Sequence, residues 1–121
     1  MPLKFPKNEK LKSRKTIETL FSEGKSLKKY PLRLLYTESE GAEITQAAFA
    51  VPKRKFKLAV TRNRIKRQMR EAYRLQKQTV LTNNGRKFAL LFLYIGTDAP
   101  NYETLEKATK NLLKTLDDEK H

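Results

Sequence analysis

The sequence predicts an α+β fold in which helices cover a small sheet. Three observations predict it. The run "FALLFLYI", residues 88–95, is apolar throughout, as in a strand buried on both faces. Two shorter segments precede it, and residues 58–78 contain neither glycine nor proline and space their apolar residues as a helix does. The expected order is helix, strand, strand, helix, strand, helix.

A chain of 121 residues has the size of one ordinary domain. We therefore expect a single domain over residues 1–121, arranged as a sandwich of helices on a sheet. Its ordered core should cover about residues 11–116, between a basic N-terminal arm and a short acidic C-terminal tail, "DDEKH".

The first helix is predicted over residues 13–23. Ser13 is a suitable N-cap and Gly24 stands where a helix stop is expected. Between them the apolar residues fall at helical spacing: Ile17, Leu20 and Phe21.

Two strands should follow, "YPLRLLYTE" over residues 30–38 and "ITQAAFAVP" over residues 44–52. The first alternates Leu32, Leu34 and Tyr36 with Arg33, Leu35 and Thr37. The turn-like "ESEGAE" lies between the two segments, so we expect them to pair with each other, and Pro52 should end the second.

The long helix, residues 58–78, is followed by a break at "NNGRK" and then by the apolar strand. Asp98, Pro100 and Asn101 are start signals for a last helix. Its apolar stripe comprises Tyr102, Leu105, Thr109, Leu112 and Leu116.

The long helix places its apolar and basic residues on adjoining faces. Its apolar residues at helical spacing are Leu58, Ile65, Met69, Ala72 and Tyr73. Each residue of a helix is rotated by about 100° around the helix axis from the one before it. On this basis a polar stripe lies directly beside Ile65, Met69, Ala72 and Tyr73. This basic stripe comprises Lys66, Arg70, Asn63, Arg74 and Arg67, with Arg62 on its border. Arg64 and Glu71 point to the far side.

The charge of the whole chain favours a polyanionic partner. Lys and Arg total 27 against 13 Asp and Glu, a formal net charge of +14. A solvated face is the usual reading of a charge run, but such a face normally intersperses acids at four-residue spacing, and this helix has almost none. Arginine also suits phosphate oxygens. A basic loop precedes the helix at its positive end: Lys53, Arg54, Lys55 and Lys57. These patterns predict nucleic-acid binding.

The residues offer no catalytic constellation. The one histidine is the last residue, His121, the acids are dispersed, and no glycine-rich phosphate loop is present. Asp98 is interpreted as a helix cap or turn residue. Cysteine is absent and no apolar run is long enough to span a bilayer, so we expect a cytoplasmic protein without catalytic residues or metal ligands.

The segment "TRNRIKRQMREAYR" resembles the RNR signature of the bacterial ribonuclease P protein component. The resemblance extends over roughly residues 11–116: "LKSRKTIETLFSEGKS" is similar to the family's N-terminal helix, and "LRLLYT" and "FAVPKRKFKLAV" to its strands leading into the basic helix. It implies a fold that joins parallel strands through the basic helix by a left-handed crossover, against the general right-handed rule.

The resemblance also implies a function: a protein subunit that assists a catalytic RNA in removing the 5′ leader from precursor tRNA. The implied partners are ribonuclease P RNA and precursor tRNA, with no membrane and no obligate protein partner, and Mg²⁺ would bind RNA. The implied RNA contacts are Arg62, Asn63, Arg64, Lys66, Arg67, Arg70 and Arg74, together with the basic loop.

A cleft for the single-stranded leader is implied at Ile17, Phe21 and Tyr36, where aromatic rings stack on bases without sequence preference. Core packing is an equal alternative for Phe21. Ile17 stands where the family often has an aromatic residue, and the loop "PKRKFKLA" lacks the glycine often found there.

Two other classes of function share some of these features. A structural RNA-binding protein of the ribosomal kind would have similar charge and size. A protein of anionic membrane surfaces is disfavoured, because the apolar stripes are needed for the core.

Overall fold

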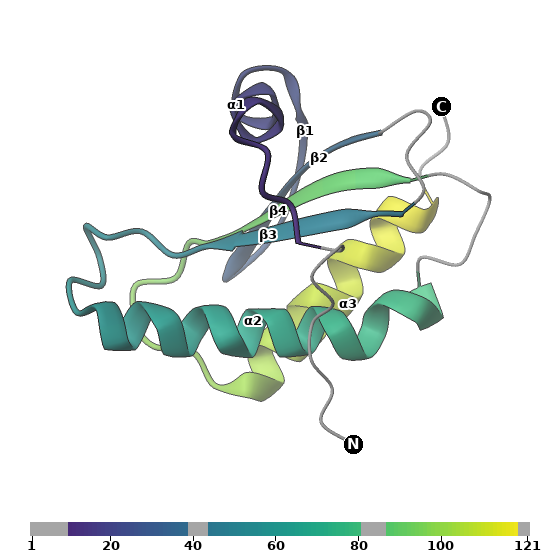
Figure 1. Cartoon of the computed structure of the whole chain (residues 1–121). Coiled ribbons are helices and arrows are strands. Elements are labelled where there is room, and N and C mark those ends of the chain that lie inside the picture. The colour runs from purple at the N-terminus through teal and green to yellow at the C-terminus, as the bar shows by residue number, and fades with distance from the viewer. Residues whose placement is uncertain (1–9, 39–43, 81–86, 119–121) are drawn as a thin grey trace.

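The computed structural model describes residues 10–38, 44–80 and 87–118. They form a four-stranded sheet in the order β1-β2-β4-β3, with α1 on one face and α2 and α3 on the other (Figure 1). The elements are α1 (Arg14–Glu23), β1 (Lys25–Lys29), β2 (Leu32–Glu38), β3 (Gln46–Ala50), α2 (Ala59–Val80), β4 (Phe88–Tyr94) and α3 (Tyr102–Asp118). The expected N-terminal arm, the end of the acidic tail and most of the turns "ESEGAE" and "NNGRK" lie outside the described residues.

The apolar strand β4 lies inside the sheet, as its sequence predicts. It pairs antiparallel with β2, where Leu34 lies opposite Phe92, and parallel with β3, where Phe49 lies opposite the same residue. All but one of its residues are buried, and Leu93 is half-buried. Because both faces of β4 are apolar, the strand is stable only where helices can cover it from both sides.

The predicted pairing of residues 30–38 with residues 44–52, which form β2 and β3, is wrong. In the described residues β2 and β3 each pair with β4 and not with each other. The turn between β2 and β3 suggested a hairpin. However, both faces of β4 are apolar, and a position between β2 and β3 is the one that buries them. The parallel pair β3 and β4 is joined through α2, as a crossover requires, and the hand of that crossover stays a prediction.

Strand β1 was not predicted. Its sequence, "KSLKK", has Leu27 as its one apolar residue and shows no alternation. It forms an antiparallel hairpin with β2 in which Lys25 lies opposite Tyr36. Its position at the sheet edge explains its composition, because edge lysines discourage pairing with other chains.

Two apolar clusters hold the sheet to its helices. The larger packs α2 and α3 on one face and includes Leu34 and Phe92. The smaller lies under α1 on the other face and includes Leu20, Leu35 and Leu91. Full burial of each such side chain contributes about 1.5–3 kcal/mol, so both layers are firmly fixed.

The helix ends follow the predicted signals. The Ser13 side chain accepts a hydrogen bond from the Thr16 N–H at 3.2 Å, and α1 ends before Gly24. The Asn101 side chain accepts from the Thr104 N–H at 2.9 Å, as a helix cap does.

Candidate nucleic-acid interface

The orientation of α2 is fixed by its buried face. Ile65, Met69, Ala72 and Tyr73 are each at most 1% exposed, which confirms this part of the predicted apolar arc. The Tyr73 ring packs against Phe92, with ring centroids 5.5 Å apart, and burial raises the pKa of its hydroxyl above the ordinary value. Leu58, expected among the apolar residues of this helix at helical spacing, instead precedes α2 and is 70% exposed.

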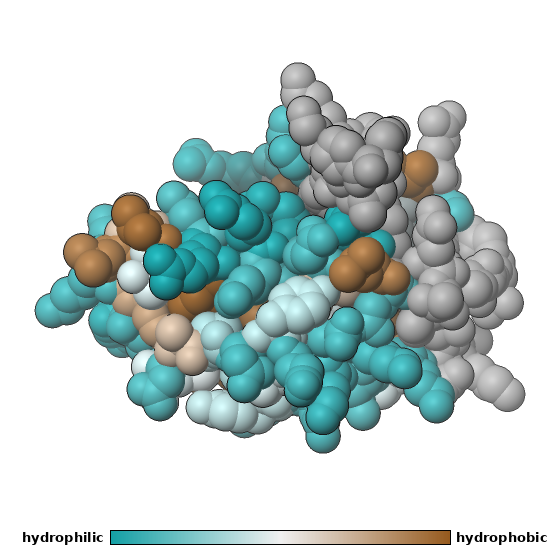
Figure 2. Space-filling view, turned by 90° about the horizontal axis from the view of Figure 1, so that it is seen from below, coloured by the Kyte–Doolittle hydropathy of each residue, from teal (hydrophilic) through white to brown (hydrophobic). Residues whose placement is uncertain are grey.

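The basic stripe lies beside this buried face. Asn63 and Arg67 are exposed, and Lys66 and Arg70 are half-buried. Arg64 is exposed as well. Within the described residues, none of these five side chains takes part in an ion pair. Hydrophilic side chains cover much of the molecule in a view from below, with a group of hydrophobic ones at one end and a separate hydrophobic spot toward the other (Figure 2).

Arg74 is less available than the sequence predicted. Its guanidinium donates two hydrogen bonds to the Glu71 carboxylate, one of them 3.2 Å long, and its side chain is only 10% exposed. The two residues are three positions apart on α2, where side chains meet. The positive charge of Arg74 is therefore already paired within the protein.

Arg62 connects the helix to the basic loop. Its Nη1 donates to the backbone carbonyls of Phe56 at 2.7 Å and Lys57 at 2.9 Å. A guanidinium suits this task because one planar group presents several donors. Arg62 therefore positions the cationic loop, a role that could not be inferred without the path of the loop.

The basic loop has a fixed path around Phe56. That ring is 8% exposed and packs on Tyr94, with centroids 5.7 Å apart, while the Phe56 N–H donates to the Pro52 carbonyl at 3.2 Å. The four cations of the loop are all exposed, and the Lys55 Nζ also donates to the Ile95 carbonyl at 3.3 Å. They precede the N-terminus of α2, where the helix dipole attracts anions. The loop cations thus lie next to the end of α2 at which the stripe begins, with Leu58 and Val60 exposed at the junction.

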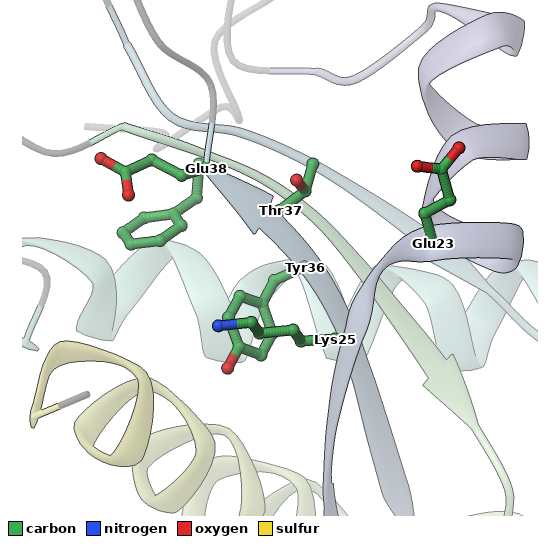
Figure 3. A pocket seen from close by; sticks show the side chains of 6 residues that line it. Glu23, Lys25, Tyr36, Thr37 and Glu38 are labelled. Atoms are coloured by element: carbon green, nitrogen blue, oxygen red, sulfur yellow. The ribbon is translucent and has the colours of Figure 1, made fainter. Parts of the chain in front are cut away.

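Tyr36 does not lie with the other two residues of the predicted cleft. It is 2% exposed and belongs to the cluster on the α2 and α3 face, with its ring edge-on to Phe88 at 6.2 Å. Figure 3 shows it beside Lys25, on the other side of β2 from Thr37. Side chains alternate along a strand, and because Leu35 faces α1, Tyr36 must face away from it. Its ring offers no stacking surface beside α1.

Ile17 and Phe21 remain together on α1. Ile17 is half-buried against the smaller cluster, and Phe21 is 61% exposed. Three partly buried side chains of β3 and β4 complete what we call the open sheet face: Ala48, Ala50 and Leu93. The alanines were missed because they carry no chemical signal, although their spacing of two places both on one side of β3.

Neither a cluster of potential metal ligands nor a membrane-spanning helix is present among residues 10–38, 44–80 and 87–118. No cluster of three histidine, cysteine, aspartate or glutamate side chains could hold a metal ion there. No helix within those ranges is long and apolar enough to cross a membrane.

The sequence model of the family described as ribonuclease P matches residues 5–117. The chain belongs to the family of bacterial ribonuclease P protein components. A curated ribonuclease P protein component of Porphyromonas gingivalis is 37% identical over 112 residues, covering 88% of this chain and 82% of the relative. That of Chlorobium phaeobacteroides is 34% identical over 125 residues, covering 91% and 86%.

Solved ribonuclease P proteins share the fold. The protein from Thermotoga maritima superposes with a TM-score of 0.74 at 24% identity, covering 88% of this chain and 96% of that one. The protein from Staphylococcus aureus gives 0.71 at 17% identity, covering 89% and 94%. Family membership makes this chain part of the ribonucleoprotein that matures the 5′ end of tRNA, and it favours this role over the ribosomal alternative.

Proposed function

We propose that this ribonuclease P protein binds the RNA subunit through the basic stripe and the basic loop. The observation that carries the proposal is the set of cations on one side of α2 that have no acidic partner among the described residues. Arg67, Arg70 and Lys66 contribute charge along the helix, and Arg62 holds the loop that extends the surface. Phosphate oxygens would replace the missing acids and relieve the repulsion between like charges.

The open sheet face would bind the single-stranded 5′ leader of precursor tRNA. Phe21 offers an exposed ring on which a base can stack, and Ile17 with Ala48 and Ala50 offers apolar contact without a second ring. Stacking tolerates any base, as a leader of variable sequence requires. Binding energy from the leader would favour precursor over mature tRNA, which lacks it.

The chemical step belongs to the RNA in this proposal. Mg²⁺ would be held by RNA, and neutralisation of nearby phosphates by the protein would allow the complex to work at lower Mg²⁺. The protein positions substrate and reduces repulsion between the RNAs.

The test is cleavage of a 5′-extended precursor tRNA by ribonuclease P RNA at low Mg²⁺, with and without the protein. Strong stimulation is expected, with no cleavage by the protein alone. A protein that binds the RNA tightly but leaves cleavage unchanged would support a purely structural role instead.

The leader site is tested by Phe21→Ala, with Leu75→Ala on α2 as a control of similar exposure, 61% against 50%. Losing one stacked base is expected to weaken precursor binding by about fivefold or more. Binding of mature tRNA should not change. Equal losses for precursor and mature tRNA would contradict a contact with the leader.

A further inference from the structure

The turn between β1 and β2 carries an unexplained combination of side chains. Tyr30 is 63% exposed, and Lys28 and Lys29 immediately before it are also exposed. The surfaces described above use none of the three. An exposed ring beside flexible cations is the combination with which proteins bind unpaired nucleotides, since the base stacks and the cations contact its phosphates.

The turn is tied to the basic loop through one residue. The Ile95 N–H donates to the Pro31 carbonyl at 2.8 Å, and the Ile95 carbonyl accepts from the Lys55 Nζ at 3.3 Å. Leu32, the first residue of β2, lies opposite Tyr94, the last residue of β4. The turn and the loop therefore lie at the same end of the sheet.

The segment that joins them is closely packed. A Cβ atom on Gly96 would lie 2.6 Å from the Tyr94 hydroxyl, which donates to the Asp98 carbonyl. Burial raises the pKa of Tyr94, and the nearby Tyr30 and Asp98 raise it further. Tyr30 thus lies beside a fixed part of the protein while most of its surface faces solvent. Asp98 is an acid near this turn, and the strand ends beside the turn and the basic loop together carry seven exposed cations: Lys28, Lys29, Arg33, Lys53, Arg54, Lys55 and Lys57.

We propose that Lys28, Lys29 and Tyr30 extend the basic loop into a surface that binds an unpaired nucleotide of the RNA subunit. The base would stack on the Tyr30 ring and the two lysines would contact its phosphates. The occupant is the RNA subunit, because the turn is connected to the loop assigned to that RNA. The leader is not the occupant in this proposal, because β4 separates β2 from the alanines of β3 in the open sheet face. This inference rests on the proposed function of the loop.

The experiment measures the affinity of the RNA subunit alone for the full-length protein over a range of salt concentrations. Tyr30→Ala is expected to weaken binding about fivefold or more, and Tyr30→Phe, which keeps the ring, to bind like the wild type. The double variant Lys28→Ala/Lys29→Ala is compared with Lys110→Ala/Lys114→Ala, which removes the same charge from exposed positions of α3. The Lys28→Ala/Lys29→Ala variant should lose more affinity for the RNA subunit than the α3 variant does. Its binding should also depend less on salt concentration.

Urea unfolding of each variant reports whether it is folded. Binding by Tyr30→Ala equal to that of the wild type, with equal losses in the two lysine pairs, would overturn the inference. So would losses that appear only when precursor replaces mature tRNA in the holoenzyme, because the leader would then be the occupant. A wild-type protein that does not bind the RNA subunit would overturn the proposed function itself, and that result is separate from a failure of the turn variants.

Discussion

Arg67 and Arg74 carry the same charge on the same helix but should contribute very differently to RNA binding. Arg67 is exposed, whereas the Arg74 side chain is 10% exposed and donates two hydrogen bonds to Glu71. Arg67→Gln and Arg74→Gln change the net charge equally. We expect Arg67→Gln to weaken binding of the RNA subunit by about 1–3 kcal/mol, the range for a charge-assisted hydrogen bond.

The effect of Arg74→Gln on folding stability and on RNA affinity follows from the ion pair between Arg74 and Glu71. With Glu71 at 45% exposure, the ion pair is partly screened and contributes about 0.5–1 kcal/mol at most to folding. Arg74→Gln should lower the free energy of unfolding by that amount and leave RNA affinity within about threefold of the wild type. Glu71→Gln removes the partner carboxylate, so it should increase RNA affinity by freeing the guanidinium.

The assay is RNA binding over a range of salt concentrations, with urea unfolding of each variant as the stability control. Arg67→Gln should reduce the slope of log affinity against log salt by about 0.7–0.9, the value for one lost phosphate contact. Arg74→Gln should leave the slope unchanged. An equal loss of affinity and slope in both variants would refute the reasoning, since it would mean that Arg74 leaves Glu71 to contact RNA.

Three further predictions concern the fold that supports this surface. Arg62→Lys should lower the free energy of unfolding by about 1–2 kcal/mol, because one ammonium cannot reproduce both hydrogen bonds to the loop carbonyls, and an unchanged urea midpoint would count against that role. Burial raises the pKa of Tyr73 above its ordinary value of 10.0, so the unfolded chain loses this proton first and stability should fall as pH rises above about 10; in Tyr73→Phe that part of the fall should be absent from unfolding free energies measured across this range. In Gly24→Ala the new Cβ would lie 2.5 Å from the Leu20 carbonyl oxygen, which should destabilise the protein by about 1–3 kcal/mol, and a thermal midpoint equal to that of the wild type would show that the end of α1 adjusts freely.

The basic stripe was predictable because helical periodicity alone fixes which residues share a face. Ile65, Met69, Ala72 and Tyr73 are buried as expected, and the stripe follows beside them. Which arginines remain available depends on their partners. The pairing of Arg74 with Glu71 could have been inferred from their three-residue spacing. The hydrogen bonds of Arg62 could not, because they depend on the path of a loop that no periodicity describes.

The cleft shows a conflict between two kinds of inference. Alternation along β2 places Tyr36 with Leu32 and Leu34, and the structure agrees with that alternation. The resemblance to the family assigned Tyr36 to the leader site with Phe21, and here the structure separates them. The pairing of strands was harder to predict, because the order of a sheet depends on contacts between distant segments that local patterns do not encode.

The central position of β4 has a consequence for synthesis of the chain. Among the described residues, β2 and β3 have no ladder with each other, so the sheet is incomplete until residues 88–94 are available to join them. Helix α2, which carries the basic stripe, is made before the strand that completes its packing surface. A chain with these late, long-range contacts folds slowly and exposes apolar surface in the meantime. An RNA that binds only the completed fold would draw the nascent protein toward it by mass action.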